Sequence, residues 1–252
     1  MTSFPSTLML LPGWGMAPSS LGELADALQA QLPGWTIDCA ALPATADDAL
    51  EVWLDDLDAR LPGHAWLAGW SLGGMLAVAL AARRESRCPG VMTLGSNASF
   101  ITRQSWGCAL PPATLAAFQS RWRDAPEKTR SRFTGLVARG SAPLAPMIRQ
   151  LEAHAALMSV EQALAGLALL AHIDLRDPFT SLSCPGLHLF AEFDALVPVG
   201  ACDAIREMLS ADSTTFRMAD TGHAFPLAQP EACARHMAAF IARHGKRGAH
   251  DC

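Results

Sequence analysis

Gly69-Trp70-Ser71-Leu72-Gly73 stands between a short apolar run at residues 65–68 and a helical run at residues 75–82. A serine on so tight a strand-to-helix turn has a strained backbone, and small residues two positions before and after it let the chain reverse without a clash. A bare G-x-S-x-G pattern also fits an ordinary glycine-rich turn. The strand before it and the helix after it favour a nucleophile, Ser71, held at the N-terminus of a helix.

Short apolar runs alternate with longer helical patterns on both sides of this turn. Between the first two runs, Ser20 and Glu23 have the spacing of a capping box at the start of a helix. Such alternation is typical of a mostly parallel sheet with helices on both faces, so we predict an α/β fold. The expected strands are residues 8–11, 36–39, 65–68, 91–94, 187–190 and 215–218.

The alternation stops between residues 107 and 170, where helical periodicities are interrupted by prolines and no convincing strand is found. A stretch of this length is too long for an ordinary connection. Apolar residues such as Leu115 and Leu151 favour a folded helical cap over a disordered loop. We therefore predict an α/β core of residues 1–106 and 171–252, with a helical cap inserted at 107–170.

Composition points to one folded protein and excludes several kinds of partner. The 252 residues are 50% hydrophobic and 17% charged, which is globular rather than disordered. The net charge of -5 and the scattered cations exclude the basic face of a nucleic-acid binder. The N-terminus lacks a basic region, and Pro5 and Pro12 interrupt its apolar run, so we expect no signal peptide, no membrane span and a cytoplasmic location. The seven cysteines form no C-x-x-C pair, which favours reduced thiols.

A serine hydroxyl becomes a good nucleophile when a base takes its proton, and after this motif the expected order along the chain is acid, then histidine. His223 follows the last expected strand in a glycine-containing loop and is the candidate base; an ordinary loop histidine is the alternative. His188 lies inside a strand and is expected in the core. Asp194 follows the penultimate strand and is the candidate for orienting the imidazole, with Glu192 and Asp220 as nearby rivals.

Two main-chain donors are needed to stabilise the oxyanion, one from the residue after the nucleophile and one from an early loop. Leu72 supplies the first. Trp14, in Pro12-Gly13-Trp14-Gly15, is the candidate for the second, although these glycines also fit a simple tight turn. No H-E-x-x-H motif and no cluster of histidines and carboxylates is present, so we expect neither a metal nor another cofactor.

These motifs resemble those of the pimeloyl-acyl-carrier-protein methyl ester esterases of biotin synthesis, which have the α/β-hydrolase fold. Two segments depart from the family pattern. Pro12-Gly13 stands where the family usually has His-Gly, and residues 41–46 replace the usual D-x-x-G-x-G-x-S turn. The matching segments are P-G-W-G at 12–15, G-W-S-L-G-G at 69–74, H-I-D-L-R at 172–176, D-A-L-V-P at 194–198 and G-H-A-F-P at 222–226.

The resemblance implies a reaction, namely hydrolysis of the methyl ester of pimeloyl-acyl carrier protein to pimeloyl-acyl carrier protein and methanol. It implies Ser71 as nucleophile, His223 as base and Asp194 as the residue that orients the base. The main-chain amides of Trp14 and Leu72 would form the oxyanion hole.

The resemblance also implies an acyl carrier protein as partner, because the family's cap presents basic side chains to this acidic protein. Arg149 is the best single candidate for such a contact, and a solvated helical face is the alternative. Trp14, Leu72 and Phe133 are the candidates for lining an acyl channel, and filling the interface between cap and core is the alternative for them.

Two other functions fit the same residues. A general short-chain carboxylesterase or thioesterase would use the same triad, because the chemistry does not identify the leaving group. A hydrolase-fold binding protein would keep the fold and have lost the catalytic activity, although a complete triad in the right order argues against this alternative. We expect a monomer.

Overall fold

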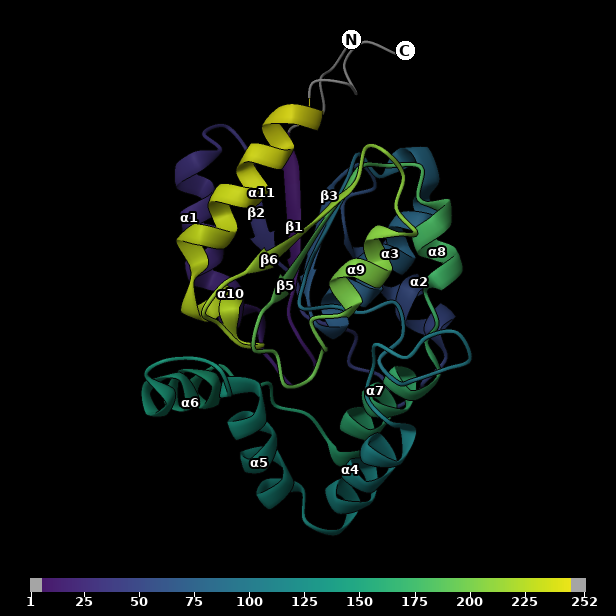
Figure 1. The fold of residues 1–252 in the computed structure, drawn as a ribbon, viewed down its shortest axis with the longest axis vertical. Helices are drawn as coiled ribbons and strands as arrows, with labels where there is room; N and C mark the ends of the chain where they lie inside the picture. The colour runs from purple at the N-terminus through teal and green to yellow at the C-terminus, as the bar shows by residue number, and fades with distance from the viewer. Residues whose placement is uncertain (1–5, 246–252) are drawn as a thin grey trace.

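The computed structural model describes residues 6–245, and a sheet of six parallel strands runs through their centre (Figure 1). The strand order is β2-β1-β3-β4-β5-β6. Every strand expected from the sequence is present within two residues of its expected ends, which confirms the predicted fold class. The strands are β1 (Thr7–Leu11), β2 (Thr36–Cys39), β3 (Trp66–Trp70), β4 (Val91–Leu94), β5 (Gly186–Ala191) and β6 (Thr214–Met218).

Helices cover both faces of the sheet, so the central strands are buried from two sides (Figure 1). Every residue of β3, β4 and β5 is buried, whereas the edge strands β2 and β6 are largely exposed. Continuous apolar runs are what such doubly covered parallel strands require. One face carries α1 (Gly22–Gln31), α10 (Phe225–Ala228) and α11 (Pro230–His244), and the other carries α2 (Leu50–Arg60), α3 (Leu72–Arg84), α8 (Arg176–Ser181) and α9 (Ala201–Arg206).

The capping box expected at the start of α1 is wrong. A 3₁₀ turn (Pro18–Leu21) precedes the helix, and the Ser20 hydroxyl donates back to the Ala17 carbonyl at 2.7 Å. The Glu23 carboxylate instead accepts from the Gln150 side chain at 3.2 Å. Because the 3₁₀ turn already gives Ser20 a helical conformation, its hydroxyl bonds a preceding carbonyl instead of capping the amides of α1.

Four helices between β4 and β5 gather beyond the carboxyl ends of the strands (Figure 1). We call them the cap helices. The first packs against the second and the fourth, and the second packs against the third. Gly140, which follows the second helix, approaches Gly222 so closely that an added Cβ would lie 2.9 Å from the Gly222 Cα. The cap helices are α4 (Pro112–Asp124), α5 (Pro126–Ala138), α6 (Leu144–Ala153) and α7 (Val160–His172).

Candidate active site

Ser71 occupies a strained turn between β3 and α3, with φ 55° and ψ −121°. Glycine is required on both sides of it. A Cβ at Gly69 would lie 2.2 Å from the main-chain carbon of Gly73, and a Cβ at Gly73 would lie 2.3 Å from the Pro12 carbonyl oxygen. Backbone strain of this kind persists only where the surroundings impose it, and Ser71, whose hydroxyl is the candidate nucleophile, is one of the strained residues.

Residues after β4 hold the turn in place. The Ser71 amide donates to the Leu94 carbonyl at 2.9 Å, and the Ser96 hydroxyl donates to the Ser71 carbonyl at 2.8 Å. Gly74 leaves room for this contact, since a Cβ there would lie 2.1 Å from the Ser96 Oγ. Ser96 was not predicted from the sequence. Its position just after a central strand, at the edge where Ser71 was expected, was the available signal.

The structure brings His223 and Asp194 together in a buried pair. His223 Nδ1 lies 2.7 Å from Asp194 Oδ2, and the two side chains are 2% and 1% exposed. The other carboxylate oxygen accepts the amides of Leu196 at 2.8 Å and Val197 at 2.9 Å. Because both oxygens are engaged, the carboxylate is fixed to accept a hydrogen bond from Nδ1–H, and Nε2 is left as the acceptor of the imidazole.

Two further residues fix the position of His223 relative to Ser71. The Trp70 indole donates to the His223 carbonyl at 2.9 Å. Gly95, with φ +59°, lies against the imidazole, since a Cβ there would be 3.3 Å from Nδ1. Leu94, the residue before Gly95, accepts a hydrogen bond from the Ser71 amide. Residues 94 and 95 therefore contact both the Ser71 turn and the His223 imidazole. These two roles could not be predicted from the sequence, because both depend on contacts between segments distant in the chain.

The rival carboxylates lie away from the imidazole. Glu192 and Asp220 are both exposed, and the Glu192 carboxylate accepts the Asp220 amide at 3.1 Å. His188 is a core residue as expected. It is fully buried and pairs with the Thr93 hydroxyl at 2.9 Å, and burial lowers the pKa of its imidazole to about 3.

Leu72 and Trp14 both lie next to the Ser71 turn. Leu72 begins α3, and the first amides of a helix have no acceptor within the helix. The Trp14 loop reaches the serine through Gly13, where a Cβ would lie 3.4 Å from the Ser71 Cβ. The Trp14 indole is 5% exposed and donates to the Ala163 carbonyl at 3.0 Å.

Aromatic side chains of the cap surround Trp14. The ring centroids of Trp122 and Phe133 lie 4.9 Å and 5.0 Å from that of Trp14, in edge-to-face contacts. A cavity of about 100 Å³ adjoins this cluster, with Trp14 and Phe133 in its lining. Leu72 and Arg149 are not part of that lining: Leu72 is fully buried and Arg149 is exposed on α6.

Residues 6–245 contain neither a metal-binding cluster nor a helix able to span a membrane. In this range no group of three or more His, Cys, Asp or Glu side chains is placed to hold a metal ion. Nor does any helix within it have the length and apolar character needed to cross a membrane. Six cysteines, from Cys39 to Cys233, are free thiols, and Cys252 lies outside the described residues.

Comparison with known proteins assigns the family. A family model described as "Alpha/beta hydrolase family" matches residues 8–236. The chain belongs to the alpha/beta hydrolase family. A protein of Aromatoleum aromaticum named pimeloyl-[acyl-carrier protein] methyl ester esterase is 33% identical over 242 residues, which cover 90% of this chain and 94% of that protein. The resemblance stated from the motifs is thereby confirmed.

This hydrolase also matches longer proteins and solved structures. It is 34% identical over 227 residues to the biotin biosynthesis bifunctional protein BioHC of Cellvibrio japonicus, and the match covers 89% of this chain but only 45% of that protein. The structure of an esterase from Exiguobacterium antarcticum superposes with a TM-score of 0.81 over 95% of this chain and 93% of that one. At 17% sequence identity this likeness shows the fold alone.

Proposed function

We propose that this hydrolase is a serine carboxylesterase that converts the methyl ester of pimeloyl-acyl carrier protein into pimeloyl-acyl carrier protein and methanol in biotin synthesis. The observation that carries the reaction type is the buried His223–Asp194 pair, which is linked to the strained turn of Ser71 by the preceding residue, Trp70, whose indole donates to the His223 carbonyl. The choice of substrate is supported by relatives of that name that align with nearly the whole chain.

In the first half of the proposed reaction, Ser71 Oγ attacks the ester carbonyl carbon while His223 Nε2 takes the hydroxyl proton. The amides of Leu72 and Trp14 donate to the oxygen that becomes negative, and Asp194 stabilises the imidazolium. The tetrahedral intermediate collapses with cleavage of the bond to the methoxy oxygen. His223 returns its proton to that oxygen, methanol leaves, and the acyl group remains on Ser71.

The second half repeats the same proton transfers with water. His223 takes a proton from a water molecule as that molecule attacks the acyl-enzyme carbonyl, and the same amides hold the oxyanion. Collapse breaks the bond to Ser71 Oγ, which receives the proton. The products are a free carboxyl group at the end of the pimeloyl chain and the regenerated serine, and no cofactor takes part in any step.

We further propose that the inserted residues 107–170 act as a cap on the core formed by 1–106 and 171–252. The cavity lined by Trp14 and Phe133 lies where the cap meets the core, which supports a role for these two rings in binding the acyl chain.

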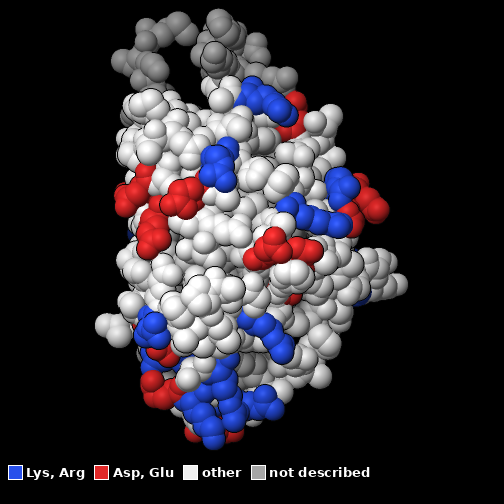
Figure 2. Space-filling model, turned by 60° about the vertical axis from the view of Figure 1, so that its left-hand side comes forward, with Lys and Arg blue, Asp and Glu red and all other residues white. Residues whose placement is uncertain are grey.

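The charge of the cap supports docking of an acidic carrier protein. Residues 107–170 contain seven Lys and Arg against four Asp and Glu, a net charge of +3, whereas the other residues contain twelve against twenty, a net charge of -8. Figure 2 shows the cations gathered at the cap end of the molecule. A shallow depression lies beside them, lined by Arg132 and Arg139 together with the exposed apolar side chains of Leu136 and Leu144. Such a local field attracts an acidic partner despite the overall negative charge.

The decisive experiment compares wild-type and Ser71→Ala protein on the pimeloyl-carrier-protein methyl ester and on p-nitrophenyl esters of increasing chain length. We expect Ser71→Ala to remain folded and to lose several orders of magnitude in rate on all substrates. Serine-dependent cleavage of the carrier-bound ester, well above the small esters, supports the proposal. If only the small esters are cleaved, the protein is a general carboxylesterase or thioesterase instead.

Carrier docking has its own test, with charge reversal at Arg149 and a matched reversal at Arg87, an exposed arginine outside the cap. Arg149→Glu should lower kcat/KM for the carrier-bound ester about ten-fold and leave small esters unchanged, and added salt should shrink the difference. Arg87→Glu should change neither. Equal losses on both substrates would mean that Arg149 is structural.

We infer a cytoplasmic monomer, and gel filtration checks its oligomeric state.

A further inference from the structure

We propose that the cap positions the oxyanion loop, residues 12–17, and that Gly166 of α7 is a positioning residue that seats the Trp14 indole. The inference rests on the proposed function, because it takes the Trp14 amide as a donor to the oxyanion.

The loop is paired with the cap through its main chain. Met16 and Ala155 form an antiparallel bridge, in which the Ala17 amide donates to the His154 carbonyl at 2.9 Å and the Ala156 amide donates to the Gly15 carbonyl at 2.8 Å. The residues after α6 thus hold the oxyanion loop as a neighbouring strand would.

The Trp14 side chain is held by a second part of the cap. Its indole N–H donates to the Ala163 carbonyl of α7, and the ring lies directly over Gly166. A Cβ at Gly166 would lie 2.6 Å from Trp14 Cδ1 and 2.9 Å from Nε1. The two α7 residues are three positions apart and therefore share one face of the helix. Only glycine lets the indole approach this closely, so the indole and the main chain that carries it take their position from α7.

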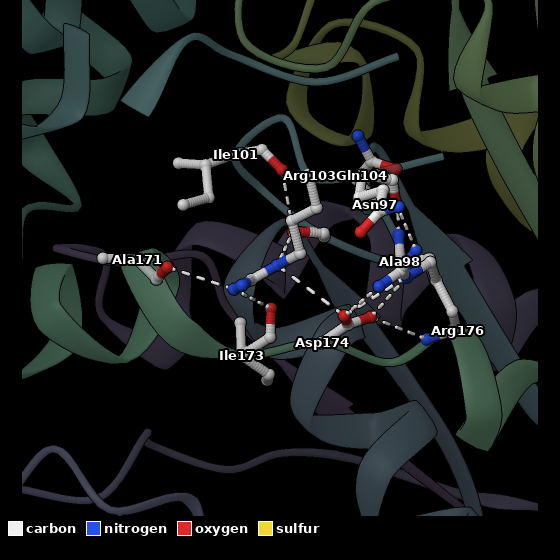
Figure 3. A network of polar contacts seen from close by, with 10 residues as sticks. Asn97, Ala98, Ile101, Arg103, Gln104, Ala171, Ile173, Asp174 and Arg176 are labelled. Carbon is white, nitrogen blue, oxygen red and sulfur yellow. Dashed lines mark hydrogen bonds and ion pairs between the residues drawn. The ribbon is translucent and has the colours of Figure 1, made fainter. Parts of the chain in front are cut away.

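Helix α7 is itself fastened to the core, as Figure 3 shows. The Arg103 guanidinium donates to the carbonyls of Ala171 at 3.1 Å and Ile173 at 3.3 Å, at the C-terminal end of the helix. Asp174 forms an ion pair with Arg176 at 2.7 Å and lies 3.7 Å from Arg103. The hydrogen bonds from Arg176 hold the pKa of Asp174 below its usual range, so this carboxylate stays ionised. These contacts attach the C-terminal end of α7, the helix that packs under Trp14, to the core.

These contacts supply a brace that the loop itself lacks. Pro12 stands where the family pattern has a histidine, and proline has neither a hydrogen-bonding side chain nor an amide proton. The adjacent residues instead depend on partners about 140 positions later in the chain. The position of the cap consequently determines where the Trp14 amide points, and with it the stabilisation of the transition state.

The test is Gly166→Ala, with Gly135→Ala as the matched control. Gly135 is also in a cap helix, and a Cβ there would meet nothing within 4 Å. With a p-nitrophenyl ester of short chain, we expect Gly166→Ala to lower kcat about ten-fold with KM within two-fold, because an oxyanion donor acts in the transition state and removing one outright costs about 10²–10³ in kcat. Binding of a trifluoromethyl ketone, whose oxyanion mimics that state, should weaken in parallel. Gly135→Ala should match the wild type in both measurements.

A double-mutant cycle with Trp14→Phe shows whether Gly166 acts through the indole. Trp14→Phe alone loses the bond to Ala163 and should lower kcat several-fold, which tests the inference even if Gly166→Ala does not fold. In the Trp14→Phe background, Gly166→Ala should lower kcat by less than two-fold. Wild-type activity of either single variant, a change confined to KM, or an undiminished loss in the double variant would overturn the inference. Ser71→Ala separates the two proposals: activity in that variant overturns the serine mechanism, whereas an inactive Ser71→Ala with an unimpaired Gly166→Ala overturns the positioning role alone.

Discussion

Replacing Asp194 by asparagine should nearly abolish activity while leaving the fold intact, and the hydrogen bonds of the carboxylate explain why. Oδ1 accepts two main-chain amides, from Leu196 and Val197, so the NH₂ group of an asparagine cannot occupy that side. It must face His223 Nδ1 in place of Oδ2, at the position now 2.7 Å away. The imidazole then accepts at Nδ1 and carries its proton on Nε2, where it cannot take the proton of Ser71.

The wrong tautomer costs about 10⁴ in kcat in a serine, histidine and aspartate triad. At 1.36 kcal/mol per factor of ten, this is about 5.4 kcal/mol of lost transition-state stabilisation. The assay is steady-state hydrolysis of a p-nitrophenyl ester, with thermal unfolding to show that the variant is folded. Glu192→Gln is the matched control, because this exposed side chain keeps its acceptor for the Asp220 amide, and its activity should be unchanged. An Asp194→Asn enzyme within ten-fold of the wild type, or a large loss in Glu192→Gln, would refute the assignment.

Three further outcomes concern stability, each measured by urea unfolding. Arg84→Met should cost about 3 kcal/mol, because the fully buried guanidinium donates to the carbonyls of Pro62 and Leu61 as well as to Asp58, and its removal leaves all three acceptors without their donor. A neutral change would contradict this. His188 has a pKa of about 3 in the folded chain against about 6.5 unfolded. The unfolded state therefore binds the extra proton, so wild-type stability should fall as the pH drops below 6.5, by about 1.4 kcal/mol per pH unit more than that of His188→Gln; parallel pH profiles would argue against it. Gly69→Ala should destabilise the protein by about 3 kcal/mol, because its Cβ would meet the backbone at 2.2 Å, while Gly63→Ala, with open space around it, should not.

The periodicity of the sequence was enough to predict the sheet, because central strands buried on both faces need unbroken apolar runs. Helix beginnings were less predictable. Ser20 and Glu23 have the spacing of a capping box, yet Pro18 starts a turn that redirects the serine hydroxyl to Ala17. A spacing rule describes local contacts and takes no account of the turn that comes before the helix.

Within the candidate site, the proposed catalytic residues could be picked out from the sequence, and the residues that support them could not. Ser71 and His223 stand in recognisable turns of the kind that a nucleophile and its base require. Gly95 and Trp70 support His223 only because the sheet brings their segments to the imidazole. The brace on Trp14 likewise joins residues about 150 apart in the chain, and no local pattern encodes such a contact.

The position of the cap helices between the neighbouring strands β4 and β5 has a consequence for chimaeric enzymes. The segments before and after these helices are paired by the β-bridge between Ser99 and Asp174. Another helical segment joined to the same two ends would therefore leave the register of β4 and β5 intact. The graft would nevertheless remove Ala155, which pairs with Met16, and Gly166, against which the Trp14 indole packs. An enzyme with a transplanted cap should therefore bind new substrates but turn them over slowly, unless the loop of residues 12–17 is exchanged together with the cap.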